Sequence, residues 1–354
     1  MPTEYLSPTN PGGGGREEEL ALHNLKAMNN MKTLEDFRRY YAEFLSKELG
    51  TAESVRKNTI VKAFLVWVFA IPITIAAVWL STSFMGQEYF WALVMLNVLV
   101  LGFLAYMLYR EILSSPRFYN LFKGRVIDGI IRFIDERLQY ISHRAVPVAV
   151  FGRSGLFHKP VHKYEGDDYC ILQLEDGTIV EFSEVHAHQK VKDSQGTHWE
   201  PIFEGLFAHI KLAQPRGGEM YIVPKNTSPE EIGTKTSRLQ SYPIENPTLS
   251  VAYELYANSP LTVKRYLTPE LIQAIASYHE QNPTLPLYYG MNGPHVYIAV
   301  PRETVLLEPN VWQSLADVQS LEKFFDDLNT LWNVITHAVD LSGQSVTSHP
   351  EQAH

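Results

Sequence analysis

The sequence predicts an α+β fold, in which a two-helix transmembrane hairpin precedes a cytoplasmic, mainly antiparallel sheet domain with flanking helices. Three observations predict it. Two long apolar stretches contain no charged residue, a series of short segments with alternating polarity follows them, and turn dipeptides join several of these segments. Strands joined by such short turns run antiparallel.

Composition limits the class of protein. The chain has 354 residues, of which 45% are hydrophobic and 19% charged, and its formal net charge is −9. This length allows one large or two small domains. The acidic balance and the lack of a long basic run argue against nucleic acid as a partner, because a phosphate backbone is bound by clustered Lys and Arg. The single cysteine, Cys170, cannot form an intramolecular disulfide, which fits the reducing cytosol.

Two unlike segments precede the apolar stretches. Residues 1–32 are expected to be a disordered tail, because the run PTNPGGGG offers little apolar surface to offset the entropy of ordering. Residues 33–62 are expected to form a cytoplasmic amphipathic helix, ending at Gly50, and a linker. The apolar face of this helix has three candidate partners: the C-terminal domain, a second subunit and the membrane. The first two are favoured, since its polar face mixes acidic and basic residues.

Residues 63–109 are predicted to form the transmembrane hairpin, with spans at 63–81 and 89–109. Each stretch has about the twenty residues that a helix needs to cross roughly 30 Å of hydrocarbon. The alternative is a buried hairpin in a soluble core. It is disfavoured because soluble helices of this length carry charges on some face.

Charges beside the spans predict their orientation. Lys and Arg residues precede the first span and follow the second, whereas residues 82–88, which connect the spans, contain neither. The flanking basic residues are Lys47, Arg56, Lys57, Lys62, Arg110, Arg117, Lys123 and Arg125. The positive-inside rule therefore predicts a multi-pass protein with both termini in the cytoplasm.

Four residues inside the hairpin are candidates for helix packing. Pro72 removes a backbone donor, and Thr74 and Asn97 are expected to face each other at similar depth on the two helices. Gly102 would allow a close approach on the same side. A mid-membrane Asn can also mark a transport path, but two spans make a poor pore, so packing or self-association through helices is favoured.

The rest of the chain is divided by its changes of period. Residues 110–145 are predicted to form a juxtamembrane stalk, helical over 118–141, and residues 146–341 the cytoplasmic domain, followed by a flexible tail over 342–354. Within the domain we expect strands at 146–151, 168–174, 178–185, 201–212, 219–223, 249–256, 287–291 and 295–300, and helices at 268–280 and 318–339.

Several short motifs resemble a known family in their order and spacing. They are FRRYYAEFLSKEL, VRKNTIVKAF, the two spans, EGDDYCILQLEDGTIVEFSE, IFEGLFAHI, VKRYLTPELIQAI and HVYIAVP. In this order, over 33–341, the chain resembles the bacterial membrane-protein family known as domain of unknown function 3137. The resemblance implies the architecture described above and a place in the bacterial cytoplasmic (inner) membrane. It implies no catalytic residue, because the family has no established activity.

Two sets of residues in the domain are candidates for a chemical site. Glu184, His186 and His188 alternate along a predicted strand, so they could share one face and bind a metal, with Asp168 or His198 completing the set. The solvated face of an ordinary strand has the same pattern, and this reading is favoured.

Asp167 and Asp168 form the second set. They could provide half of an acid and base pair with Glu181 or Glu184. A turn leading into a strand is the more common reason for Gly-Asp-Asp, and it is favoured here.

Two function classes stay open. One is a non-catalytic binding or scaffold module whose partners are the lipid bilayer and a protein or a second copy of the chain. The other is a membrane-tethered metal-dependent hydrolase using Asp168, Glu184 and His186. The first is favoured, and no cofactor is expected, because no phosphate-binding loop or nucleophile motif occurs. Convergence of the three side chains within a pocket would favour the second class, and their scatter over an exposed face would favour the first.

Overall fold

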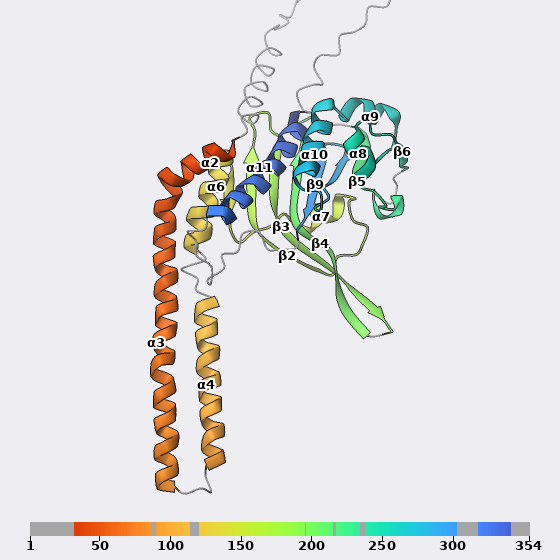
Figure 1. The fold of residues 1–354 in the computed structure, drawn as a ribbon. Coiled ribbons are helices and arrows are strands. Elements are labelled where there is room, and N and C mark those ends of the chain that lie inside the picture. Colours follow the sequence, from red (N-terminus) through yellow and green to blue (C-terminus); the bar gives the residue numbers. More distant parts are fainter. Residues whose placement is uncertain are drawn as a thin grey trace, which may run out of the picture. The chain divides into compact units, whose positions relative to one another are not determined.

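The computed structural model describes residues 32–85, 90–113, 120–194, 196–214, 217–233, 238–302 and 318–340 (Figure 1). Most of the two predicted tails lies outside these residues. The chain divides into two compact units. We call residues 34–133 with 307–323 the helical unit, and residues 1–33, 134–306 and 324–354 the sheet unit.

The helical unit begins with the short helix α2 (Leu34–Tyr40) and the π-helical turn η1 (Tyr41–Leu45), which lead into α3 (Ser46–Met85). The expected helix end at Gly50 is wrong, because α3 passes through this residue. An interior glycine costs a helix about 1 kcal/mol relative to alanine. Leu49 and Ala52 on either side of it are buried, and this packing keeps the helix continuous.

The apolar face of α2 and η1 packs within its own unit. Its partner is the segment expected to be the stalk, which contains η3 (Phe122–Ile127) and α6 (Asp128–Ile134). Tyr40 donates a hydrogen bond to the carbonyl of Gly129 at 3.2 Å, and its ring stacks on Phe133 with 4.5 Å between centroids. A methyl group at Gly129 would lie 3.0 Å from Leu45. Glycine at this position therefore allows the two segments to approach closely.

Helices α3 and α4 (Phe90–Leu113) carry the two predicted spans and lie side by side (Figure 1). Among the described residues one helix, Leu34–Leu80, is long and apolar enough to cross a membrane, and no part of its most apolar window is buried. The apolar part of the second helix, Val94–Met107, is shorter than a span. The structure thus supports one candidate span and leaves the two-helix transmembrane hairpin a prediction.

The predicted stalk helix over 118–141 is too long. The helix ends at Ile134, and Gln139–Ile141 is strand β1. Asp135 explains the end, because its carboxylate accepts hydrogen bonds from both the backbone and the guanidinium of Arg137. The backbone N–H of Leu138 then donates to the carbonyl of Asp135, which closes a turn.

The sheet unit contains a nine-stranded sheet within the described residues, in the order β1-β2-β3-β4-β9-β8-β5-β7-β6. Every pair of neighbours is antiparallel, so the predicted α+β class with an antiparallel sheet is confirmed. The other strands are β2 (Lys163–Gln173), β3 (Ile179–Asp193), β4 (Gly196–Lys211), β5 (Glu219–Pro224), β6 (Gln240–Tyr242), β7 (Tyr253–Ala257), β8 (Tyr288–Asn292) and β9 (His295–Pro301).

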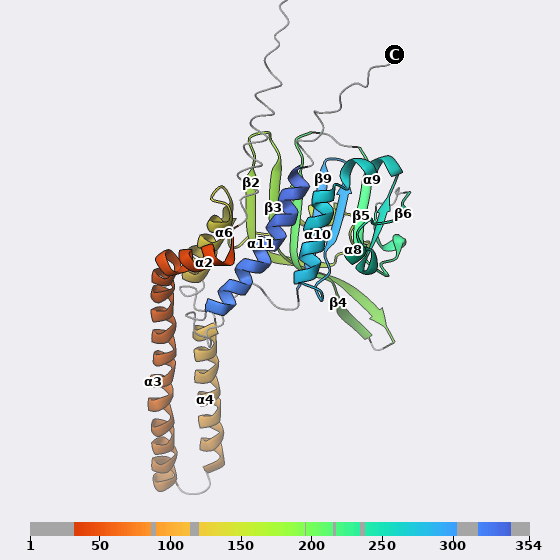
Figure 2. The ribbon, with the colours of Figure 1, turned by 45° about the horizontal axis from the view of Figure 1, so that its top comes forward.

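Helices lie on both faces of this sheet (Figures 1 and 2). The short helix α7 (Val148–Arg153) covers one face, where Phe151 packs on Phe207 with 5.1 Å between ring centroids. The long helix α11 (Val318–Asp340) covers the other face, where Trp332 contacts Phe182. The further elements are η4 (Pro229–Glu231), α8 (Pro247–Ala252), α9 (Pro260–Tyr266) and α10 (Pro269–Gln281).

Two predicted strands are wrong, wholly or in part. Residues 146–151 form no strand, because α7 begins after Pro147, whose carbonyl accepts the first helical hydrogen bonds. Residues 249–256 are helical in their first half, where α8 is capped by the side chain of Asn246, and become extended only at Tyr253. Pro247 occupies the first helical position of α8, which favours a helix start, and Pro147 is the N-cap of α7.

Local turn and cap signals are confirmed. Asp176 and Gly177 connect β2 to β3, and Gly177 has a φ of 89°. Asn292 and Gly293 lie at the turn between β8 and β9. Thr268 caps α10 by accepting a hydrogen bond from the backbone N–H of Leu271 at 3.2 Å.

Candidate functional site

A bulge in β2 builds the candidate site. Asp167 pairs with Glu184, but the next paired residue of β2 is Cys170, opposite Phe182, so β2 contains one extra residue. Asp168 takes this position with a φ of 57°. Aspartate adopts this left-handed conformation more readily than most residues. Because the bulge interrupts the alternation of side chains, two consecutive aspartates reach the same side of the sheet.

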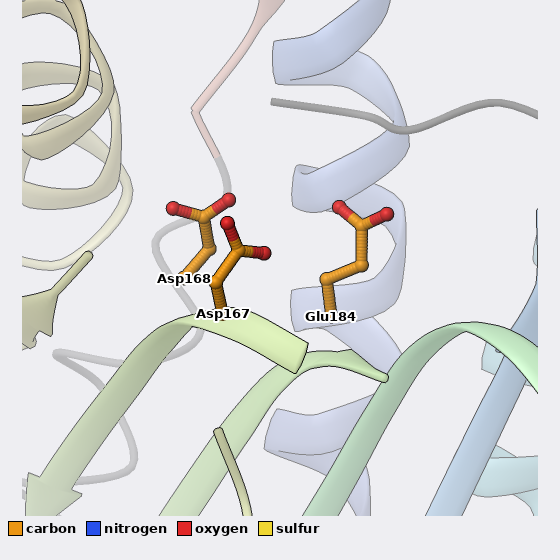
Figure 3. A group of neighbouring side chains, drawn as sticks. All are labelled: Asp167, Asp168 and Glu184. Carbon is orange, nitrogen blue, oxygen red and sulfur yellow. The ribbon is translucent and has the colours of Figure 1, made fainter. Parts of the chain in front are cut away.

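Three carboxylates converge at the bulge. Asp167, Asp168 and Glu184 each offer an oxygen atom that lies within 4.8 Å of the others (Figure 3). Asp168 and Glu184 are buried, and Asp167 is partly exposed. Oxygen ligands about 2.3–2.6 Å from a calcium ion lie at mutual distances of this order. The arrangement can therefore hold a divalent cation, and we call these three residues the carboxylate cluster.

Tyr140 of the edge strand β1 supports the cluster. Its hydroxyl donates a hydrogen bond to Oδ1 of Asp168. Burial, followed by the neighbouring carboxylate of Asp168, raises the pKa of Tyr140 well above its ordinary value, so this hydroxyl stays a donor across the physiological range.

Two histidines extend the polar surface along β3. His186 Nε2 lies 3.2 Å from Oε1 of Glu184, and His188 Nε2 lies 2.9 Å from Oε1 of Glu204 on β4. His186 Nδ1 is 4.0 Å from the same Glu204 oxygen. The two histidines thus alternate with carboxylates along one face of the sheet.

The structure brings together some of the predicted site residues and separates others. Asp168 and Glu184 share the cluster, and His186 contacts it through Glu184. His188 interacts with Glu204 rather than with the cluster. His198 lies near the β3–β4 turn, 3.6 Å from Asp193.

Glu181, the alternative acid or base partner, has other neighbours. Its carboxylate accepts hydrogen bonds from Tyr169 and His209. Asp167, by contrast, pairs directly with Glu184, so the geometry favours Glu184 as the neighbour of the two aspartates.

Sequence reasoning missed Tyr140 and Glu204. Tyr140 fell within a predicted helix, and only the turn-forming carboxylate of Asp135 signalled that this helix ends earlier. Glu204 lies within the apolar run of β4, and it aligns with His186 only through the register of the sheet. Strand register depends on tertiary pairing, which the local pattern does not contain.

The four residues predicted to pack the hairpin lie on α3 and α4. Pro72 lies inside α3, and the hydroxyl of Thr74 donates to carbonyls of its own helix, those of Ala70 and Ile71. Thr74 also lines an apolar hollow of about 470 Å³ between α3 and α4. Asn97 is partly buried on α4. A Cβ added to Gly102 would meet no atom within 4 Å, so Gly102 faces open space. Their role in packing stays a prediction.

Residues 201–338 match the model of the family described as Protein of unknown function (DUF3137), so the family resemblance is confirmed over these residues. No curated protein matches the chain. The carboxylate cluster lies outside the matched residues, and the match assigns no activity.

One solved structure is weakly similar to this chain. It is the crystal structure of the mycobacterial trehalose monomycolate transport factor A, TtfA, at 9% sequence identity and a TM-score of 0.29. The alignment covers 56% of this chain and 88% of that chain. A similarity at this level carries no argument about function.

Proposed function

We propose that the chain is a membrane-anchored binding or scaffold module, displayed on the cytoplasmic face of a bacterial inner membrane. The observation that carries this proposal is the exposed apolar surface of α3. Ten large apolar side chains between residues 63 and 81 are exposed: Phe64, Leu65, Val66, Val68, Phe69, Ile71, Ile73, Ile75, Trp79 and Leu80.

The energy of exposing this surface to water decides its environment. Burying one fully exposed large apolar side chain stabilises by about 1.5–3 kcal/mol, so ten that are about half exposed amount to roughly 8–15 kcal/mol. A lipid bilayer removes that cost, and α3 satisfies its own backbone polar groups as hydrocarbon requires. A large protein partner would do the same, which makes extraction from membranes the relevant test.

Helix α4 supports a second span. The whole helix has 24 residues, about 36 Å at 1.5 Å per residue, although its apolar part, Val94–Met107, is shorter. Its exposed apolar side chains include Trp91, Leu99 and Phe103. With the basic residues on the outer flanks of both spans, this favours a two-pass anchor with both termini in the cytoplasm.

A binding role is supported by a ribbon that extends from the sheet. β3 and β4 pair as far as Asp193 and Gly196, whereas β2 stops opposite His188 and β9 stops opposite Gly205. Trp199 on this ribbon is 51% exposed. The amino group of Lys190 lies 5.9 Å from the centre of its ring. Exposed tryptophans of this kind are enriched among residues that dominate protein interfaces.

Reporter fusions test the topology. A cytosolic reporter fused after His354 and another fused ahead of Leu34 should both be active in the cytoplasm, and one inserted between the two helices should be active outside it. Translocation of either terminal reporter would refute the proposed orientation.

Affinity purification tests the binding role. Purification in mild detergent should recover a second copy of the chain or a partner, and a Trp199→Ser variant should recover less of it. A Thr197→Ser variant, on the same ribbon, is the matched control. A monomeric protein recovered alone from membranes would contradict a scaffold role.

The second candidate is cation-dependent hydrolysis at the carboxylate cluster. The close approach of Asp167, Asp168 and Glu184 favours it over a dispersed polar face. A metal held there would activate water, and His186 beside Glu184 would accept its proton. Metal analysis of the purified protein tests this candidate. Absence of a bound cation after dialysis against Mg²⁺, Ca²⁺ or Mn²⁺ would remove it.

A further inference from the structure

A chain of four polar side chains crosses the sheet on the face covered by α7. The hydroxyl of Tyr169 donates to Oε2 of Glu181 at 2.6 Å, and Nδ1 of His209 lies 2.8 Å from Oε1 of the same carboxylate. His209 Nε2 in turn lies 2.9 Å from Nδ1 of His295. These residues come from β2, β3, β4 and β9, which are consecutive in the sheet. We call them the polar chain.

The acid end of the polar chain is ionised. Burial raises the pKa of Glu181, but hydrogen bonds from His209 and Tyr169 outweigh it and hold this pKa below its ordinary value. A carboxylate only accepts hydrogen bonds, so His209 must carry a proton on Nδ1.

The number of protons on the two imidazoles decides which ring donates at their contact and whether the hydrogen bond can form. A nitrogen-to-nitrogen distance of 2.9 Å is a hydrogen bond, which needs one donor and one acceptor. With both rings neutral, His295 Nδ1 donates to His209 Nε2. One added proton still leaves one donor and one acceptor at the contact, and the carboxylate of Glu181 compensates the charge. A second added proton places two N–H groups against each other and breaks the bond.

The surroundings oppose that second proton. Burial lowers the pKa of His295, and His209, Arg153 and Lys211 lower it further. Among the described residues, the charged or titratable groups around the polar chain include Tyr164 and Tyr169 of β2, Glu181 of β3, Lys211 of β4, Tyr297 of β9, Arg153 of α7 and Arg144, whose guanidinium lies 4.6 Å from the centre of the Tyr169 ring. Glu181 is the acid among them that bonds directly to the pair.

We propose that His209 and His295 form an acid-sensitive contact, which fastens the β8–β9 turn to β4 while at most one of the two rings is charged and opens when both are charged. His295 is the first residue of β9, and it pairs with Lys211 near the end of β4. The carbonyl of Pro294 in the same turn accepts from Leu212. Opening the contact removes this side-chain link at one end of the pair of β4 and β9 and leaves the backbone pairing in place.

Acid reduces the stability that this contact contributes to the fold. The pKa of His295 is lower in the folded chain than in the unfolded one, so the unfolded chain binds the proton more readily. The contribution to stability is complete above about pH 6.5, the ordinary pKa of histidine, and is lost as the pH falls through the lowered value.

Histidine-selective ¹⁵N labelling of the full-length protein in detergent micelles, with a chelator present, tests the proposal. The ring signals of His209 and His295 should change together, with a step below about pH 6.5, the ordinary pKa of histidine, and the exposed His143 is the site of the control substitution. In His295→Phe, which retains an aromatic ring, this low step should disappear, and His143→Ala should leave it in place.

The unfolding temperature gives a second readout. Between pH 7 and pH 5 it should fall further in the wild type than in His295→Phe. Where the Phe variant does not fold, His295→Asn replaces it, because its amide can form the hydrogen bond but does not titrate. Independent titration of His209 and His295, each at about pH 6.5, would overturn the proposal, as would equal acid sensitivity of the wild type and the variants.

Discussion

Removing the hydroxyl of Tyr140 should destabilise the sheet unit. In Tyr140→Phe the buried carboxylate of Asp168 loses the hydrogen bond that the tyrosine donates. Asp168 is 2% exposed, so water cannot replace the donor. Hydrogen bonds to charged groups contribute about 1.5–3 kcal/mol, and we expect the free energy of unfolding to fall by roughly that amount.

Urea unfolding of the full-length protein in micelles at pH 7, followed by tryptophan fluorescence, measures this loss. A double-mutant cycle with Asp168→Asn isolates the pair, because asparagine tolerates the positive φ of the bulge and carries no charge. Tyr140→Phe should cost less in the Asp168→Asn background than in the wild type. A loss below about 0.5 kcal/mol, or equal losses in both backgrounds, would refute the stabilisation of the Asp168 carboxyl group by Tyr140.

Four further predictions concern stability and cation binding. Gly205→Ala should abolish folding or cost several kcal/mol by thermal unfolding, because the new Cβ would lie 2.2 Å from the backbone carbonyl oxygen of Val300 at a φ of 148°. Asp327→Asn should cost about 3–5 kcal/mol in urea unfolding, because it leaves the buried guanidinium of Arg302 without its 3.1 Å carboxylate partner. Saturating Ca²⁺ should raise the unfolding temperature of the wild type and raise that of Glu184→Gln less; equal shifts would argue against the cluster as the binding site. Since the pKa of Glu181 is lowered, its contribution to stability is present above about pH 4.3 and lost at lower pH, so Glu181→Gln should flatten the acid limb of the stability profile, and an unchanged limb would contradict this.

Local chemistry explains which parts of the fold could be predicted. The hairpins at Gly177 and Gly293 and the helix capped by Thr268 depend on a few adjacent residues, and each signal is present in the sequence. The long helix over 318–340 shows its buried face through helical spacing. These elements occur where the sequence predicts them.

Packing between distant parts of the chain explains the wrong predictions at residues 146–151 and at Gly50. The run from Val146 to Phe151 has strand-like composition, yet the burial of Val150 and Phe151 against the sheet stabilises a short helix. Gly50 has the residue type of a helix end, but packing on both sides keeps the helix intact. Tertiary contacts outweigh local preference in both places.

The candidate site was predictable only in part. Glu184 and His186 alternate along a strand, and this period is visible in the sequence. The meeting of Asp167 with Asp168 depends on a bulge, which places two consecutive residues on one side against the ordinary alternation. The partner of His209 could not be inferred either, because 86 residues separate it from His295.

Alkaline carbonate extraction of membranes from cells that express the full-length chain tests the central claim most directly. Carbonate releases proteins held at the surface by contacts with other proteins and leaves integral ones in the bilayer. The exposed apolar surface of α3 predicts that the chain stays in the pellet and enters solution only with detergent. Release of the intact chain into the carbonate supernatant would contradict membrane anchoring.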